Sequence, residues 1–210
     1  MEASKAVWDR LELTLEQTAP AVLSTFLKPA SLDEILDAEE ELDLIFPAEL
    51  RCAYLRHNGS IRDANPLFFL PGRSNLHTLA ELKERWGFNR EFALINWEDE
   101  CDSTLDSEFN QGKVRVDVWN PARIPIGHSS GAAHILMDLL PAVQGTIGQL
   151  VEDQEFIGCI TDASVFASGL NEYLTLFTDR LEQGLIVCSP QNYWLNQRGQ
   201  ASFDWATLMA

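Results

Sequence analysis

The sequence is poor in the residues that build metal and redox sites. It contains four cysteines and four histidines among 210 residues. Cys52, Cys101, Cys159 and Cys188 lie far apart, form no Cys-x-x-Cys pair and have no histidine at metal-ligand spacing beside them. We expect reduced and mostly buried thiols, with a disulfide between two of them as the alternative. The sequence therefore predicts neither a metal site nor another cofactor.

Long apolar runs are also missing. The N-terminal segment lacks the apolar core of a secretory signal, and no later segment approaches the roughly 20 apolar residues of a membrane span. We therefore expect a cytoplasmic protein that does not enter a membrane.

Basic residues are scarce. The chain has 15 Lys and Arg against 32 Asp and Glu, which gives a net charge of -17. Such a surface repels nucleic acid and anionic lipid, so neither is an expected partner. Two explanations of the charge remain open: it keeps the protein soluble, or the natural partner has a basic surface.

What the sequence does contain is enough apolar residues for a large core, at 46% of the chain, without a linker or repeat that divides it. The first part has helical periodicity. Ser31 and Glu34 have the spacing of a capping box, which satisfies two backbone amides at a helix start. The pattern predicts helices over 4–17, from Pro20 to before Pro29, from Ser31 through Leu42, and from Pro47 to an Asn58-Gly59 turn.

The rest of the chain alternates strand patterns with two further helices. Leucine and tryptophan spacing over 76–86 predicts a helix that Gly87 ends. A second helical pattern over 170–181 has Ser168 as its cap and Gly184 as its stop. Predicted strands cover 66–71, 93–97, 114–118, 124–126, 134–139, 147–151 and 156–160, and peripheral strands or a hairpin follow Leu185.

Several motifs in a fixed order resemble the SUKH superfamily, whose members include the yeast Smi/Knr cell-wall regulator and many bacterial immunity proteins. The resemblance spans roughly residues 1 to 184, and the chain departs from the family pattern at Ser60 and at Gly131-Ala-Ala-His134. The motifs that carry it are Ala30-Ser-Leu-Asp-Glu-Ile35, Phe46-Pro-Ala-Glu-Leu-Arg51, Leu55-Arg-His-Asn-Gly59, Trp119-Asn-Pro with Ile124-Pro-Ile, Asp138-Leu-Leu-Pro141 and Gly145-Thr-Ile-Gly-Gln149.

The resemblance implies a single α+β domain over 1–184, with a mostly antiparallel sheet flanked by helices. Residues 185–210 are then a C-terminal extension packed on the same domain. It also implies a protein that binds other proteins and has no catalytic residues. The leading hypothesis is an immunity protein that neutralises one cognate polymorphic or contact-dependent toxin, with a nucleic-acid-acting toxin as the expected target. The alternative is a non-enzymatic regulatory scaffold similar to the yeast regulator. The oligomeric state stays open.

A dense run of acids follows the predicted strand 93–97, with no basic residue among them. If the toxin has a cationic cleft, this segment would dock there in place of phosphates, with charge speeding association and aromatic anchors supplying affinity. The alternative is an ordinary solvated acidic loop. A calcium site is not expected, because the central glycine of a calcium loop is absent. The candidate partner-binding residues are Trp97, Glu98, Asp99, Glu100, Asp102, Asp106 and Glu108.

A second acidic run is expected to be an exposed helix face, because its acids alternate with leucines. It comprises Asp37, Glu39, Glu40, Glu41 and Asp43.

A Ser-His-Asp set can be assembled from Ser129, His128 and Asp138, but no nucleophile-elbow sequence surrounds the serine. We therefore assign Asp138 as a hydrogen-bond acceptor at a strand end or turn. No enzymatic activity is expected.

The tryptophans divide into two groups. Trp8, Trp86 and Trp119 lie in apolar patterns typical of a core, whereas Trp97 and Trp194 are candidate interface anchors.

Overall fold

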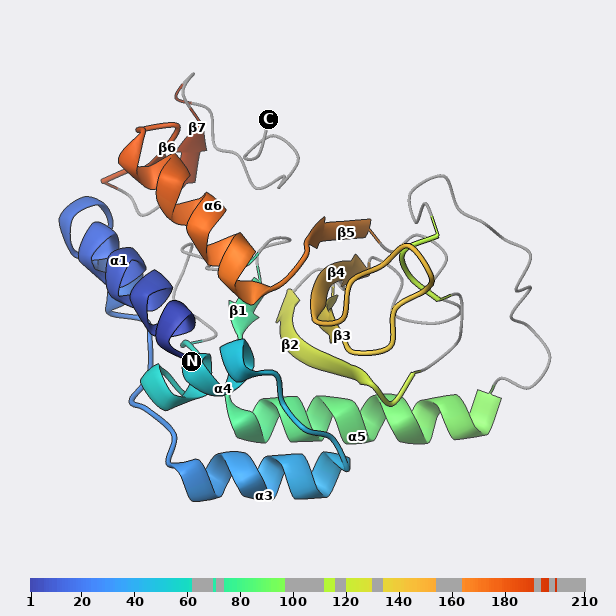
Figure 1. The fold of residues 1–210 in the computed structure, drawn as a ribbon. Helices are drawn as coiled ribbons and strands as arrows, with labels where there is room; N and C mark the ends of the chain where they lie inside the picture. Colours follow the sequence, from blue (N-terminus) through green and yellow to red (C-terminus); the bar gives the residue numbers. More distant parts are fainter. Residues whose placement is uncertain are drawn as a thin grey trace.

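The structure is a computed structural model, which describes residues 1–61, 70, 74–96, 112–115, 120–129, 134–153, 164–190, 194–196 and 199. Within these residues four helices come first, and most strands follow the fifth helix, as in an α+β fold (Figure 1). The helices are α1 (Glu2–Thr18), α2 (Pro20–Leu23), α3 (Leu32–Leu42), α4 (Ala48–Arg56), α5 (Leu79–Asn96) and α6 (Leu170–Glu182). The strands are β1 (Ser74–Leu76), β2 (Arg123–Ser129), β3 (His134–Asp138), β4 (Gln149–Asp153), β5 (Ser164–Ala167), β6 (Ile186–Cys188) and β7 (Trp194–Asn196).

The main sheet has five strands in the order β1-β2-β3-β4-β5, and every neighbouring pair is antiparallel. In Figure 1 α5 lies below the sheet beside β2, and α3 lies below α5. The strands β6 and β7 form a separate antiparallel pair after α6. The predicted fold class, an antiparallel sheet flanked by helices, is therefore confirmed. No helix of the described part is both long and apolar enough to cross a membrane.

Strand β3 is buried on both faces of the sheet. Alternate residues of a strand point to opposite faces, and those of β3 belong to two different buried clusters. Ile135 and Met137 of β3 belong to the main core, together with side chains from the helices. Leu136, which lies between them, packs instead in a smaller cluster with Val114 and Val151. All of His134–Asp138 is buried. Burial on both faces accounts for the continuous apolar run from Ile135 to Met137 in the middle of the strand.

The N-terminal helices follow the sequence prediction closely. The Glu34 amide donates to the Ser31 hydroxyl at 3.2 Å, and the Ser31 amide donates to the Glu34 carboxylate at 2.7 Å, so the capping box is complete. The predicted exposed acidic face of α3 is wrong at one position. Glu39 is buried, and its carboxylate accepts two hydrogen bonds of 2.6 Å from Arg51 and one of 2.7 Å from the Phe46 amide. An ion pair across two helices overrides the amphipathic pattern here.

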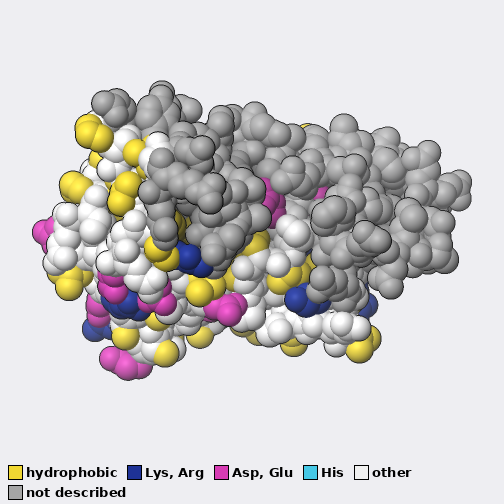
Figure 2. Space-filling view, turned by 90° about the horizontal axis from the view of Figure 1, so that it is seen from above, with side chains coloured by type: hydrophobic (Ala, Val, Ile, Leu, Met, Phe, Trp, Pro, Cys, Tyr) yellow, Lys and Arg dark blue, Asp and Glu magenta, His cyan; other side chains and the backbone are white. Residues whose placement is uncertain are grey.

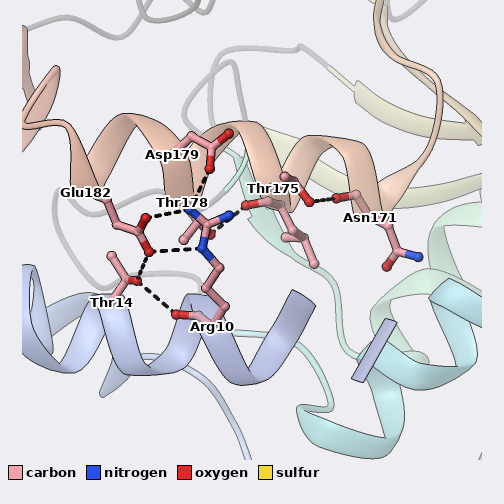
Figure 3. Close-up of polar contacts among 8 residues, drawn as sticks. Arg10, Thr14, Asn171, Thr175, Thr178, Asp179 and Glu182 are labelled. Carbon is pink, nitrogen blue, oxygen red and sulfur yellow. Dashed lines mark hydrogen bonds and ion pairs between the residues drawn. The ribbon is translucent and has the colours of Figure 1, made fainter. Parts of the chain in front are cut away.

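Helices α1 and α6 lie side by side although they come from opposite ends of the chain (Figure 3). Nε of Arg10 donates to the Glu182 carboxylate at 3.0 Å, and Nη2 donates to Asp179 at 2.6 Å. The Thr14 hydroxyl also reaches Glu182, at 3.0 Å. These hydrogen bonds, first from Arg10, lower the pKa of Glu182 below its ordinary value. Because both partners are half exposed, the contribution of this pair to stability is modest.

The prediction for α5 needs two corrections. Gly87 does not end the helix, and residues 93–96, predicted as a strand, form its last turn. A glycine costs a helix only about 1 kcal/mol, so buried Leu79, Leu82 and Trp86 carry the helix through it. The short apolar run 93–96 is too brief to show a helical or a strand period, so its sequence alone does not distinguish the two structures. Val114 lies in a bend and not in the predicted strand.

The start of α6 is held by tertiary contacts. Ser168 is not the cap, because Gly169 occupies that position without a side chain. Instead the Glu49 carboxylate of α4 accepts hydrogen bonds from the amides of Leu170 at 3.1 Å and Asn171 at 3.0 Å. A carboxylate satisfies free amides and the positive end of the helix dipole together.

Two tryptophan assignments are confirmed and one is wrong. Trp8 and Trp86 are core residues as predicted, but Trp194 is buried against Phe177, with ring centroids 5.5 Å apart, and is not an exposed anchor. The predicted strand over 156–160 and Trp119 lie outside the described residues, as does most of the predicted strand 66–71.

A candidate partner-binding loop between β3 and β4

The acidic candidate segment lies outside the described residues. This applies to Trp97 and to all six acids predicted there, so their role stays a prediction. The motifs Asp138-Leu-Leu-Pro141 and Gly145-Thr-Ile-Gly-Gln149 lie within the described residues.

The strand register separates the residues of the hypothetical Ser-His-Asp set. His128 pairs with His134 at one end of β2, whereas Asp138 pairs with Arg123 at the other. Five residues along a strand correspond to about 16 Å, which is far beyond hydrogen-bond reach. Asp138 therefore does not act on His128 or Ser129.

Three polar side chains form a row across the sheet at the base of the β3–β4 loop. Arg123 of β2 pairs in register with Asp138 of β3, which pairs with Gln149 of β4. All three are fully or almost fully buried. Arg123 Nε lies 3.8 Å from Asp138 Oδ1, and Arg123 Nη2 donates to the carbonyl of Arg115 at 2.6 Å. We call Arg123, Asp138 and Gln149 the loop base.

The loop base is bonded directly to the loop backbone. Oδ1 of Asp138 accepts from the Leu140 amide and Oδ2 accepts from the Gln149 side chain, both at 3.1 Å. The Gly148 amide closes the loop by donating to the Asp138 carbonyl at 2.8 Å. The assignment of Asp138 as an acceptor at a strand end is thus confirmed.

A short neighbouring segment, residues 112–115, fixes the middle of the loop. The Lys113 carbonyl accepts from the Gln149 side chain at 2.9 Å and from the Ala142 amide at 3.0 Å. The side-chain carbonyl of Gln149 accepts from the Thr146 amide at 3.0 Å. At Gly145 an added Cβ would lie 2.2 Å from the Lys113 carbonyl oxygen, so only glycine permits this approach.

The outer part of this rigid loop carries apolar side chains. Val143 is fully exposed, Ile147 is 73% exposed and Leu140 is 43% exposed. We call these three residues the loop tip. Lys113 and Arg115 lie on the supporting segment, and Arg115 Nε donates to the Pro141 carbonyl at 3.2 Å. Apolar groups held in water by a preorganised backbone are typical of a surface that binds another protein.

Sequence reasoning missed the loop tip. The motifs were recognised as markers of the fold, and Ile147 was placed at the start of a strand that begins only at Gln149. The available signal was an isolated Val and Ile between prolines and glycines, which no strand or helix period requires.

The described residues contain no group of three His, Cys, Asp or Glu side chains able to hold a metal ion. Cys52 and Cys188 are free, as predicted, and burial raises the pKa of both thiols, which disfavours the reactive thiolate. Cys101 and Cys159 lie outside the described part. A hollow of about 220 Å³ beside α5 is smaller than ordinary ligand pockets, and it is lined by His77, Glu81, Glu84, Arg85 and Phe88.

Figure 2 shows one face of the molecule, seen from above the view of Figure 1. On the part of that face that is coloured, acidic and basic side chains lie next to each other and apolar atoms are scattered. Scattered apolar residues need no partner to explain them. The loop tip differs because its three apolar side chains belong to one short, fixed loop.

The fold is α+β, and its β3–β4 loop is fixed by hydrogen bonds to buried side chains. The sequence model of the SMI1/KNR4 family (SUKH-1) matches residues 29–176, from α3 into α6. The chain therefore belongs to the SMI1/KNR4 family, as the motifs predicted. A comparison with curated proteins gave no match.

Proposed function

We propose that the protein is an immunity protein, which binds one cognate protein toxin and blocks it without catalysis, cofactor or metal. It acts in the cytoplasm, where a toxin that attacks nucleic acid would work. Membership of the SMI1/KNR4 family supports this class of function, since the resemblance extends to bacterial immunity proteins as well as to the yeast regulator.

The single observation that carries the proposal is the loop tip. Three aliphatic side chains are held in solvent by a backbone whose amides and carbonyls are bonded to a buried polar row. A loop already in its bound conformation loses little entropy on association, so its apolar contacts contribute more fully to affinity. This arrangement suits tight binding of one partner.

The charge supports a basic toxin. With 32 acidic and 15 basic residues, the chain attracts a cationic protein over several ångströms and speeds its docking. The acidic segment from Glu98 to Glu108 is the proposed contact for the cationic cleft of the toxin. The loop tip supplies apolar contacts to the same toxin.

The experiment is recovery of partners by the tagged protein from its native cells, with mass spectrometry after a high-salt wash. We expect one stoichiometric protein whose expression alone stops growth and whose co-expression with this chain restores growth. Several substoichiometric proteins, none of them toxic, would contradict the proposal and favour the regulatory scaffold.

A further inference from the structure

Helix α3 is fixed in one rotational orientation. Ile35, Ala38 and Leu42 are buried on its inner side, and the buried Glu39 is bonded to Arg51 and to the Phe46 amide. In Figure 1 α3 forms the lower edge of the molecule, with α5 above it. The side of α3 that points away from α5 is therefore a permanent surface feature.

Two leucines lie on the exposed side of this helix. Leu32 is 53% exposed and Leu36 is 46% exposed, and their i, i+4 spacing places both side chains on one face of the helix. Neither is needed to bury α3, because the inner side is complete without them. Two adjacent exposed leucines on a short, well-capped helix are a compact apolar surface of the kind that a partner covers.

Exposed carboxylates border the leucines. Asp33, Asp37 and Glu40 are exposed on the same outward part of the helix, and no ion pair within the described residues reaches them. The neighbouring cations are engaged elsewhere, since Arg51 bonds Glu39 and Lys83 lies 2.8 Å from Glu41. The outer face of α3, defined as Leu32, Asp33, Leu36, Asp37 and Glu40, is thus apolar with an acidic border.

We propose that the outer face of α3 is a docking surface for a partner protein. Because the border is acidic, the partner is expected to present an apolar recess edged by Lys or Arg. The leucines supply affinity by entering the recess, and the carboxylates orient the encounter. That this partner is a toxin rests on the proposed function, whereas the docking surface itself does not.

The first test is photo-crosslinking in the native cells. A photoreactive phenylalanine analogue replaces Leu36 in one variant and Leu13, an exposed leucine of α1, in a control. We expect the variant at position 36 to crosslink to the same protein that the tagged chain recovers, and the variant at position 13 to give no such product. Absence of a crosslink at position 36 would overturn the proposal.

The second test measures affinity for the purified recovered protein. Leu32→Ser with Leu36→Ser is expected to weaken binding about tenfold or more, while Leu13→Ser leaves it unchanged. Asp37→Asn with Glu40→Gln should slow association several-fold and flatten its salt dependence. The matched control, Glu2→Gln with Glu16→Gln on α1, removes the same charge and should retain more of the wild-type rate.

The two proposals fail in different ways. Wild-type affinity in the leucine variant, with its melting temperature unchanged, would remove α3 from the interface even if the partner is a toxin. Conversely, a recovered protein that does not stop growth would contradict the immunity function, yet weaker binding by the leucine variant would still place α3 in its interface.

Discussion

The base and the tip of the β3–β4 loop differ in almost every physical respect, although a few residues separate them. The loop base is polar and buried, with a hydrogen bond from Gln149 to Asp138 and an ion pair between Asp138 and Arg123. The loop tip is apolar and exposed. Buried polar side chains must be hydrogen-bonded, so the base fixes the geometry of the loop, and that fixed geometry holds the apolar side chains of the tip in solvent.

The largest effect is expected from breaking the loop base. Asp138→Ala leaves Arg123 buried with its facing carboxylate removed, and breaking a buried ion pair in this way costs about 3–5 kcal/mol of the free energy of unfolding. Urea denaturation measures the loss. Asp37→Ala, at an exposed position of α3, should change stability by less than about 0.5 kcal/mol. Similar effects of the two changes would contradict the structural role of the base.

A smaller effect is expected where the loop backbone meets its support. Gly145→Ala places a methyl group against the Lys113 carbonyl and should cost about 1–3 kcal/mol. Gly87→Ala is the matched control, because nothing lies within 4 Å of its Cβ and alanine favours the interior of α5. We expect that control to stabilise the protein by about 0.5–1 kcal/mol. Equal melting temperatures for both variants would show that the loop is not tightly fixed.

A still smaller loss of stability is expected from replacing Glu49. Glu49 lies near Gly148 and also bonds the first amides of α6. Glu49→Ala should cost about 0.5–2 kcal/mol in thermal unfolding, as loss of a helix cap does. Glu49→Gln keeps an acceptor and should lose less. A full loss with glutamine would assign the effect to charge and not to capping.

The smallest stability effect is at acidic pH, far from the loop. Hydrogen bonds from Arg10 hold the pKa of Glu182 below the ordinary value of 4.5. The stabilisation by this group is therefore present above pH 4.5 and is lost as the pH falls through the lower pKa of the folded state. Glu182→Gln should show a shallower loss of melting temperature over that range. An unchanged acid profile would mean that Arg10 and Glu182 do not interact in solution.

Local signals predicted the helical half of the molecule well. The Ser31 and Glu34 spacing and the proline that precedes α4 act through neighbouring residues, so sequence alone finds them. The burial of Glu39 and the capping of α6 by Glu49 depend on residues that meet only in the folded chain. No local pattern contains that information.

The candidate site was only half predictable for the same reason. The motif around Asp138 was recognised, and its role as a turn acceptor followed from its place at a strand end. The exposure of Val143 and Ile147 depends on the path of the loop, which the contacts with Lys113 determine from a distance in the sequence. Apolar residues in the sequence do not by themselves show which of them will be exposed to solvent in a loop.

The most direct test of the account replaces the loop tip alone. Val143→Asp with Ile147→Asp is compared with wild type and with the exposed control Leu13→Asp, for melting temperature and for protection of cells that express the recovered partner. We predict an unchanged melting temperature and lost protection for the tip variant, with protection retained by the control. Full protection by the tip variant would contradict the claim that this loop binds the partner.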